Sequence, residues 1–132
     1  ALTWGLVDVR DVAAAHLAAM EVPAAAGRYL CVAGNMSMAE AITLMRAEGY
    51  AGKLPKLDLS GGFGTAVMKL ASYSQPAGIG SYLRSHLGRV PQYDNGKSRR
   101  DLGISYRPAA NSLRDTLADL ARWGHIAAAE RL

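Results

Sequence analysis

The chain has 132 residues, of which half are apolar and a fifth are charged, and its formal net charge is +4. This length limits it to one domain at most, and the composition is typical of a globular protein with a modest core. No apolar run approaches the roughly 18 residues that a membrane-spanning helix needs, so we expect no membrane partner.

The N-terminal residues predict a strand followed by a helix. Residues 3–9 (TWGLVDV) are apolar and β-branched enough for a strand. Asp8 occupies the position of a helix N-cap, with Asp11 three residues later as its capping-box partner. The helix is expected to end near Val22, because Pro23 follows. Its apolar positions recur at helical spacing and are Val9, Val12, Ala13, His16, Leu17 and Met20.

A second strand and a second helix are predicted next. Residues 28–33 (RYLCVA) are apolar enough for a strand that is buried in a sheet. Ser37 and Glu40 form a capping box at the start of a helix, and Gly49 fits the left-handed position behind its end. The order strand, helix, strand, helix predicts an α/β fold.

Residues 54–91 differ from the rest because glycines divide them into short pieces. Helices are expected over 65–73 and 79–87, and such a region either shapes a pocket as a lid or is a plain surface excursion. A short helix is predicted over 95–102, ended by Gly103. The last helix is predicted to begin at a capping box over 112–115 (SLRD), with an apolar stripe of Leu113, Leu117, Leu120 and Ala121.

The segment 93–97 (YDNGK) fits the Y-x-x-x-K pattern of a catalytic tyrosine–lysine pair. A lysine ammonium beside a tyrosine lowers the phenol pKa and makes it a useful acid-base group, provided that both side chains share one helix face. Asp94 is a good N-cap, and Gly96 would weaken a helix that passed through it. The helix is therefore predicted to begin after Tyr93, so that Tyr93 and Lys97 do not converge.

The other reactive side chains are given structural roles. His16 is predicted to be a core histidine, because no second metal ligand accompanies it and no metal site is expected. Cys31, the single cysteine, excludes an internal disulfide and is expected to be a small buried residue in a reducing cytoplasm. Asp8 and Asp11 could act as acid and base, but capping accounts for both. Three close cations are interpreted as a solvated helix face and not as a nucleic-acid contact: Lys97, Arg99 and Arg100.

Several short motifs occur in one order: WGLVDVRDVAAAH (4–16), AAGRYLC (25–31), SMAE (37–40), YDNGK (93–97), DLGISYRP (101–108) and SLRDT (112–116). This series resembles the C-terminal part of an extended short-chain dehydrogenase/reductase of the NAD-dependent epimerase/dehydratase family, and most nearly its dihydroflavonol-reductase-like branch. The resemblance covers nearly the whole chain. It implies an α/β fold class, namely the C-terminal portion of a Rossmann-type NAD(P)-binding enzyme.

The resemblance also implies how the chain is divided. Residues 1–53 would be a strand-helix-strand-helix part associated with the nucleotide-binding sheet, to which 28–33 would return. Residues 54–132 would be a mainly helical substrate-binding lobe. The family's glycine-rich dinucleotide turn has no counterpart, since SGGFG (60–64) and GIGSY (78–82) follow no convincing strand. The family's catalytic tyrosine–lysine pair is absent as well. NAD(P) would then belong to the complete enzyme, with none bound by this chain alone, and the missing N-terminal Rossmann part would be its partner.

The implied activity is the reduction of a small-molecule ketone or aldehyde by hydride transfer, with this chain alone inactive. Nucleotide-sugar epimerases usually carry an arginine-glycine-aspartate element that LGRVPQ (87–92) lacks, which favours a carbonyl reductase over the alternative, an epimerase or dehydratase. Another alternative is a stand-alone interaction module whose strand edges are covered by a partner or in a homodimer. Substrate contacts are expected from Phe63, Met68, Tyr82, Arg84, Arg89 and Tyr93.

Overall fold

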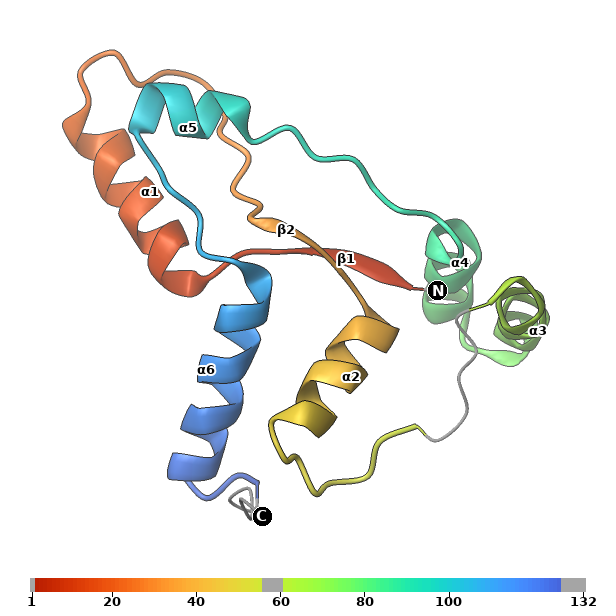
Figure 1. Cartoon of the computed structure of the whole chain (residues 1–132). Helices are drawn as coiled ribbons and strands as arrows, with labels where there is room; N and C mark the ends of the chain where they lie inside the picture. Colours follow the sequence, from red (N-terminus) through yellow and green to blue (C-terminus); the bar gives the residue numbers. More distant parts are fainter. Residues whose placement is uncertain (1, 56–60, 127–132) are drawn as a thin grey trace.

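A computed structural model of the chain describes residues 2–55 and 61–126; Ser60, the first residue of the SGGFG segment, lies outside these ranges. The fold is mixed α/β, mostly helical with one small sheet. Its elements in chain order are β1 (Thr3–Leu6), α1 (Val9–Glu21), β2 (Gly34–Ser37), α2 (Met38–Ala47), α3 (Gly62–Ala71), the 3-10 helix η1 (Ser72–Ser74), α4 (Ala77–His86), α5 (Gly96–Leu102) and α6 (Ala109–Arg122). Figure 1 shows the strands in the middle, α1, α5 and α6 beyond one end of them, and α3 and α4 at the other end.

The sheet has two antiparallel strands, with register from Thr3 opposite Ser37 to Leu6 opposite Gly34. The prediction of a strand over 28–33 is wrong, because the segment that pairs with β1 is β2, which lies just after these residues. A strand needs a hydrogen-bonded neighbour, and within the described ranges none lies beside residues 28–32. Instead, the Leu30 carbonyl accepts from Ser98 Oγ at 3.0 Å and the Val32 carbonyl accepts from Asn95 Nδ2 at 2.6 Å.

Helix α1 begins where the sequence predicts, since Asp8 is its N-cap and accepts from the Arg10 backbone N–H at 2.9 Å. Its buried face, however, differs from the predicted one. The residues that turn inward are Asp11 and Ala15, while Leu17 is 58% exposed and His16 lies at the surface with Nδ1 2.8 Å from the Val12 carbonyl oxygen. The prediction of a core histidine is therefore wrong.

The core explains why the buried face of α1 differs from the predicted one. Ala15 packs with Leu102 and Ile104, and half-buried Cys31 and Tyr106 lie against this cluster. Small alanines let α1 approach α5 closely, so the larger apolar side chains of α1 remain on the outer side.

Helix α2 confirms its predicted capping box. The Glu40 backbone N–H donates to Ser37 Oγ at 3.2 Å, and the Ser37 backbone N–H donates to Glu40 Oε2 at 2.7 Å, which lowers the pKa of the Glu40 carboxyl. Gly49 ends the helix in the predicted left-handed conformation, with φ +76°. Helix α2 packs against α6, which Figure 1 shows beside it.

The last two helices confirm one predicted start and correct the other. Helix α5 begins after Tyr93 as predicted and ends at Gly103 in the left-handed region, but its N-cap is Asn95 and not the predicted Asp94. Helix α6 begins at Ala109, three residues before the predicted capping box, so Ser112 lies inside the helix. Pro108 explains the earlier start, since its fixed φ suits a helix entry and its carbonyl accepts from the Asn111 and Ser112 N–H groups.

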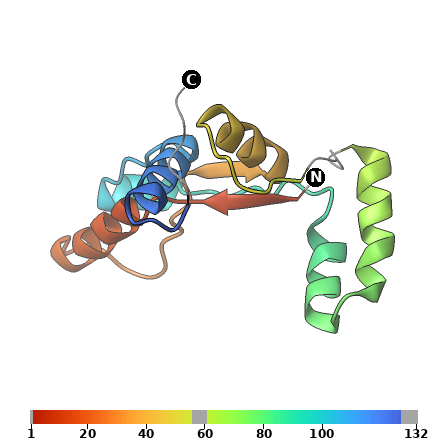
Figure 2. The same ribbon diagram turned by 90° about the horizontal axis from the view of Figure 1, so that it is seen from below.

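Helices α3 and α4, joined by η1, form a hairpin that projects from the rest of the molecule (Figure 2). Both helices were predicted, with slightly different bounds. A Cβ built on Gly80 would lie 2.4 Å from the Ser72 carbonyl oxygen, so glycine is needed where the hairpin closes. Within residues 2–55 and 61–126, no helix is long and apolar enough to cross a membrane.

Candidate functional site

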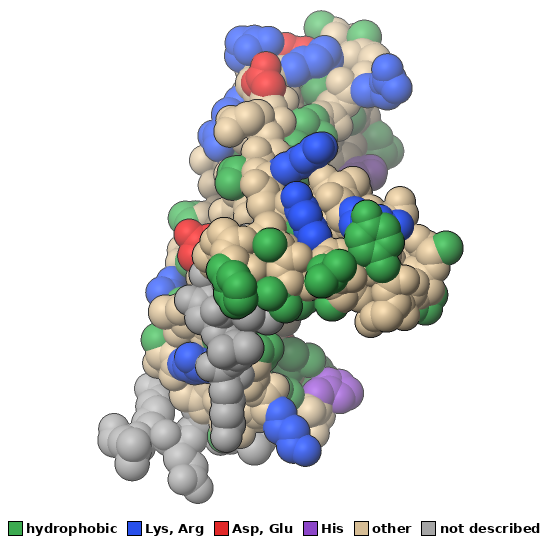
Figure 3. Space-filling model, turned by 90° about the vertical axis from the view of Figure 1, so that its right-hand side faces the viewer, with side chains coloured by type: hydrophobic (Ala, Val, Ile, Leu, Met, Phe, Trp, Pro, Cys, Tyr) green, Lys and Arg blue, Asp and Glu red, His purple; other side chains and the backbone are tan. Residues whose placement is uncertain are grey.

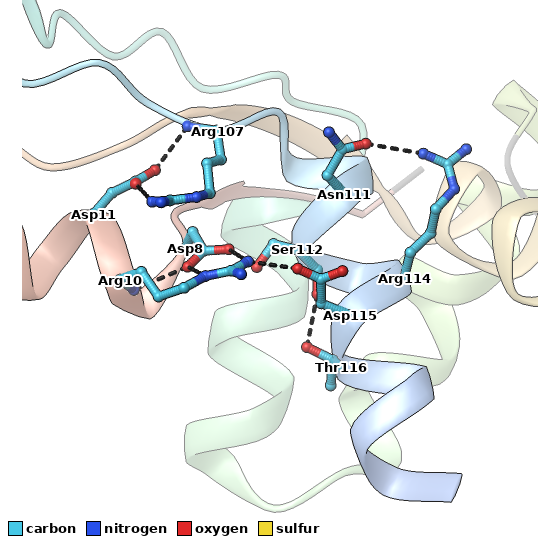
Figure 4. Close-up of polar contacts among 9 residues, drawn as sticks. All are labelled: Asp8, Arg10, Asp11, Arg107, Asn111, Ser112, Arg114, Asp115 and Thr116. Atoms are coloured by element: carbon cyan, nitrogen blue, oxygen red, sulfur yellow. Dashed lines mark hydrogen bonds and ion pairs between the residues drawn. The ribbon is translucent and has the colours of Figure 1, made fainter. Parts of the chain in front are cut away.

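Arginine and carboxylate side chains converge where the start of α1 meets the start of α6 (Figure 4). We call this group the arginine cluster; it consists of Arg10, Arg107 and Arg114 with their partners Asp8, Asp11, Glu48, Asn111 and Asp115. The cluster lines a surface pocket of about 370 Å³, to which all three arginines, Asn111 and Asp115 contribute.

Arg10 is held by two carboxylates. Its Nε and Nη2 donate to the two oxygens of Asp8 at 2.8 and 2.6 Å, and Nη2 also donates to Asp115 Oδ2 at 2.6 Å. The bidentate hydrogen bonds from Arg10 hold the pKa of the Asp8 carboxyl well below its usual range. The same pair, together with Asp115, raises the pKa of Arg10. Asp8 is thus an ionised anchor that joins α1 to α6 through Arg10.

Asp11 makes a contact that corrects its predicted role. Its carboxylate, 2% exposed, accepts from the Arg107 backbone N–H at 2.7 Å and from the Arg107 guanidinium. These partners lie 96 positions away in the sequence, whereas a capping box would have turned Asp11 back toward the Asp8 backbone. Asp11 therefore fixes the segment that leads into α6.

Arg114 completes the cluster. Its Nε donates to Glu48 Oε1 at 2.7 Å and its Nη1 donates to Asn111 Oδ1 at 3.0 Å, which joins the end of α2 to α6. Every guanidinium of the cluster therefore has a carboxylate partner. The positive charge of the pocket is neutralised from within, so its geometry suits a structural junction better than an anion site.

The geometry of the cluster also bears on catalysis. A general base must take up a proton near neutral pH, and the lowered pKa of Asp8 opposes this. The acid-base alternative for Asp8 thus has no support, and the Asp11 carboxylate is buried and already bonded to Arg107. The sequence contained one signal of the junction, since both VDVRD and SLRD place an arginine beside aspartates, but both patterns were interpreted as helix caps.

Two of the predicted substrate residues lie against neighbouring positions of β1. The Trp4 indole Nε1 donates to Tyr82 Oη at 3.2 Å, and the Tyr82 ring stacks on His86 with centroids 4.1 Å apart. Tyr93 packs on Gly5, where an added Cβ would lie 2.5 Å from its Cε2. Tyr82, from α4, and Tyr93, from the loop before α5, thus both contact β1, but at consecutive positions, whose side chains point to opposite faces of a strand.

The other four predicted substrate residues are dispersed. Arg84 closes the hairpin, because its Nη1 donates to the Ser72 carbonyl at 3.2 Å and its guanidinium carbon lies 4.6 Å from the Tyr73 ring centroid. Met68 is half-buried on α3. Phe63, which is 84% exposed, and Arg89 lie at the surface.

Lys97 has partners other than Tyr93. Its Nζ donates to the Ala26 carbonyl at 2.8 Å, pairs with Asp101 at 2.9 Å and lies 3.5 Å from the Tyr29 ring centroid. Desolvation works to lower the pKa of Lys97, but Asp101 and Tyr29 outweigh it and raise the pKa. Lys97 is therefore bound by Ala26, Tyr29 and Asp101. The YDNGK segment is the start of a helix.

Metal ligands do not gather in the described part of the chain, where no group of three or more His, Cys, Asp or Glu side chains could hold an ion. The rings of His16 and His86 are both hydrogen-bonded within their own helices.

Comparison with known proteins finds reductases. A ketoreductase azaE of Aspergillus niger is 34% identical over 122 residues, which are 89% of this chain and 28% of that protein. A cinnamoyl-CoA reductase 1 of Arabidopsis thaliana is 29% identical over 126 residues, or 96% of this chain and 30% of the relative, and one of Oryza sativa subsp. japonica is 28% identical over 120 residues, or 91% and 29%. No family model and no solved structure matches the chain.

The chain therefore spans less than a third of the length of these relatives. The matched proteins are all reductases, which supports the predicted resemblance to the short-chain dehydrogenase/reductases at the level of a reductase family.

Proposed function

We propose that this chain is part of an NAD(P)-dependent carbonyl reductase of the extended short-chain dehydrogenase/reductase family, in its dihydroflavonol-reductase-like branch. The complete enzyme transfers a hydride from the nicotinamide to the carbonyl carbon of a ketone or aldehyde. A tyrosine outside this chain supplies the proton to the carbonyl oxygen. The observation that carries this proposal is the similarity of nearly the whole chain to a ketoreductase and to cinnamoyl-CoA reductases.

The segment 28–33 supports a role in a larger sheet. Among the described residues, no acceptor lies within hydrogen-bonding distance of the backbone N–H groups of 29–32. The Leu30 and Val32 carbonyls, two residues apart, both face α5, as alternate residues of an extended chain do. On the opposite side the Ala33 N–H donates to the Leu6 carbonyl, whereas the backbone N–H and carbonyl groups of 29 and 31 bond no residue that the structure describes. An added strand of the missing Rossmann part would satisfy them.

The outer face of α1 supports the same role. Its large apolar side chains Val9, Leu17 and Met20 are exposed. A helix that covers a sheet buries such a stripe against it. In this account α1 lies on the sheet that 28–33 joins.

The substrate would be contacted by residues 54–132, the second part of the chain. Tyr82 and Tyr93 are the strongest candidates, since both are held against β1, at Trp4 and at Gly5. Met68, Arg84 and Arg89 would contribute from the hairpin and the segment after it. The nicotinamide belongs to the missing part.

The isolated chain tests this proposal directly. With NADH or NADPH and a simple ketone or aldehyde, it should oxidise no cofactor, and turnover would contradict the proposal. Hydrogen exchange gives a second readout: the amides of 29–32 should exchange fast in this chain and slowly in a longer polypeptide that contains the Rossmann part. Equally fast exchange in both would refute the sheet role.

A second candidate function, a stand-alone interaction module, is favoured by the exposed side chains of α1. Light scattering separates the two. A stable homodimer that Leu17→Asp dissolves would support the module, whereas a monomer with fast exchange at 29–32 would support the reductase part.

A further inference from the structure

The hairpin of α3, η1 and α4 carries an apolar stripe on its outer side. Phe63, Val67 and Leu70 stand at the i, i+4 and i+7 positions of α3 and are 84%, 41% and 74% exposed. Such spacing gives one continuous helix face. Tyr73 and Ile79, in η1 and α4, are exposed as well. The inner face of α3 is the one at buried Gly64 and half-buried Met68, so the stripe has no partner among the described residues.

The charge around the stripe is of one sign. Residues 61–93 contain Lys69, Arg84 and Arg89 but no aspartate or glutamate, and thus carry three of the chain's four net positive charges. None of these three cations pairs with a carboxylate in the described part of the chain. This differs from the arginine cluster, where every guanidinium is neutralised. Figure 3 faces this side of the molecule and shows hydrophobic side chains in a row across its middle, with Lys and Arg side chains beside them.

We infer that this outer face of the hairpin binds an anionic lipid surface. A helix whose apolar face is flanked by cations lies in the plane of a membrane interface, with its apolar side chains among the acyl chains and its cations at the headgroups. Lys69, which is exposed on α3, stands about 100° around the helix from Leu70 and about 140° from buried Gly64, on the side of α3 away from its packed face. The hairpin projects from the body, so the stripe can reach a flat surface (Figure 2). This inference revises the expectation that the chain has no membrane partner, and it assigns Phe63 to lipid rather than to substrate.

Vesicle binding tests the inference. The 132-residue chain is mixed with phosphatidylcholine vesicles that do or do not contain phosphatidylserine, and the bound fraction is measured by sedimentation at low and raised salt. Binding should require phosphatidylserine and weaken with salt. Leu70→Asp, which places a charge in the stripe, should lower the affinity about tenfold or more.

The matched control is Trp123→Asp at the end of α6, where an apolar side chain of similar exposure, 71%, lies outside the hairpin. It should bind vesicles as the unaltered chain does, and circular dichroism checks that both variants are folded. No binding to phosphatidylserine vesicles, or an equal loss in both variants, would overturn the inference. A dimer without vesicles that only Leu70→Asp dissolves would make a second copy the occupant and would also overturn it. The assay contains no nicotinamide, so its failure leaves the reductase proposal untouched.

Discussion

Replacing Asp11 by alanine is expected to destabilise the chain by about 1.5–4 kcal/mol. The Asp11 carboxylate is 2% exposed and accepts from the Arg107 backbone N–H. Leaving that N–H without an acceptor costs about 1–3 kcal/mol. The ion pair with the Arg107 side chain, which is 47% exposed, adds only about 0.5–1 kcal/mol because water screens it.

Two further variants separate these contributions. Asp11→Asn keeps an oxygen acceptor for the Arg107 N–H and loses only the charge, so it should cost about 1 kcal/mol. Asp119→Ala on α6 removes an exposed carboxylate that has no hydrogen bond or ion pair within the described residues, and should change the free energy of unfolding by less than about 0.5 kcal/mol. Urea unfolding followed by far-UV circular dichroism measures all three. Equal costs for Asp11→Ala and Asp119→Ala would refute the junction between α1 and the segment before α6.

Three other changes have defined outcomes. Ser98→Ala removes a fully buried hydroxyl (0% exposed) whose single proton is shared between the Leu30 and Asn95 carbonyl oxygens, at 3.0 and 2.8 Å, so urea unfolding should show a loss of about 1–3 kcal/mol; a loss below about 0.5 kcal/mol would contradict the packing of α5 on 28–33. Gly103→Ala should lower the melting temperature because φ is +67°, whereas Gly78→Ala, on an open helical position, should leave it unchanged or raise it slightly; the reverse order would refute the α5 ending. The pKa of Asp8 is lowered in the folded chain, so its contribution to stability is complete above the ordinary aspartate pKa near 4 and is lost as the pH falls. Acid titration should therefore destabilise the unaltered chain more than Asp8→Asn between about pH 5 and pH 3, and parallel curves would show that Asp8 contributes no such stability.

Features that depend on a few neighbouring residues could be predicted from the sequence. The Asp8 cap, the Ser37–Glu40 capping box and the glycines that end α2 and α5 rest on hydrogen bonds and dihedral angles within one helix turn. The start of α5 after Tyr93 follows from the same kind of signal.

Features that depend on distant partners could not. The apolar spacing of α1 identified a stripe, but Ala15 and Asp11 turn inward because α5 and Arg107 lie on their side. The apolar composition of 28–33 predicted a strand, but no partner strand lies beside it in the described residues. The arginine cluster was missed because its partners are up to 105 positions apart. The exposure of the α3 stripe likewise depends on how the hairpin closes.

The most direct test of the central claim is to identify the natural polypeptide that contains this sequence and to assay it. An antibody raised against the 132-residue chain can purify that polypeptide, and its mass and its oxidation of NADH or NADPH with a panel of ketones and aldehydes can then be measured. The account predicts a polypeptide several times heavier than 14.0 kDa that consumes the nicotinamide only when a carbonyl compound is present. A natural polypeptide of 14.0 kDa, or a larger one without nicotinamide-dependent turnover, would contradict it.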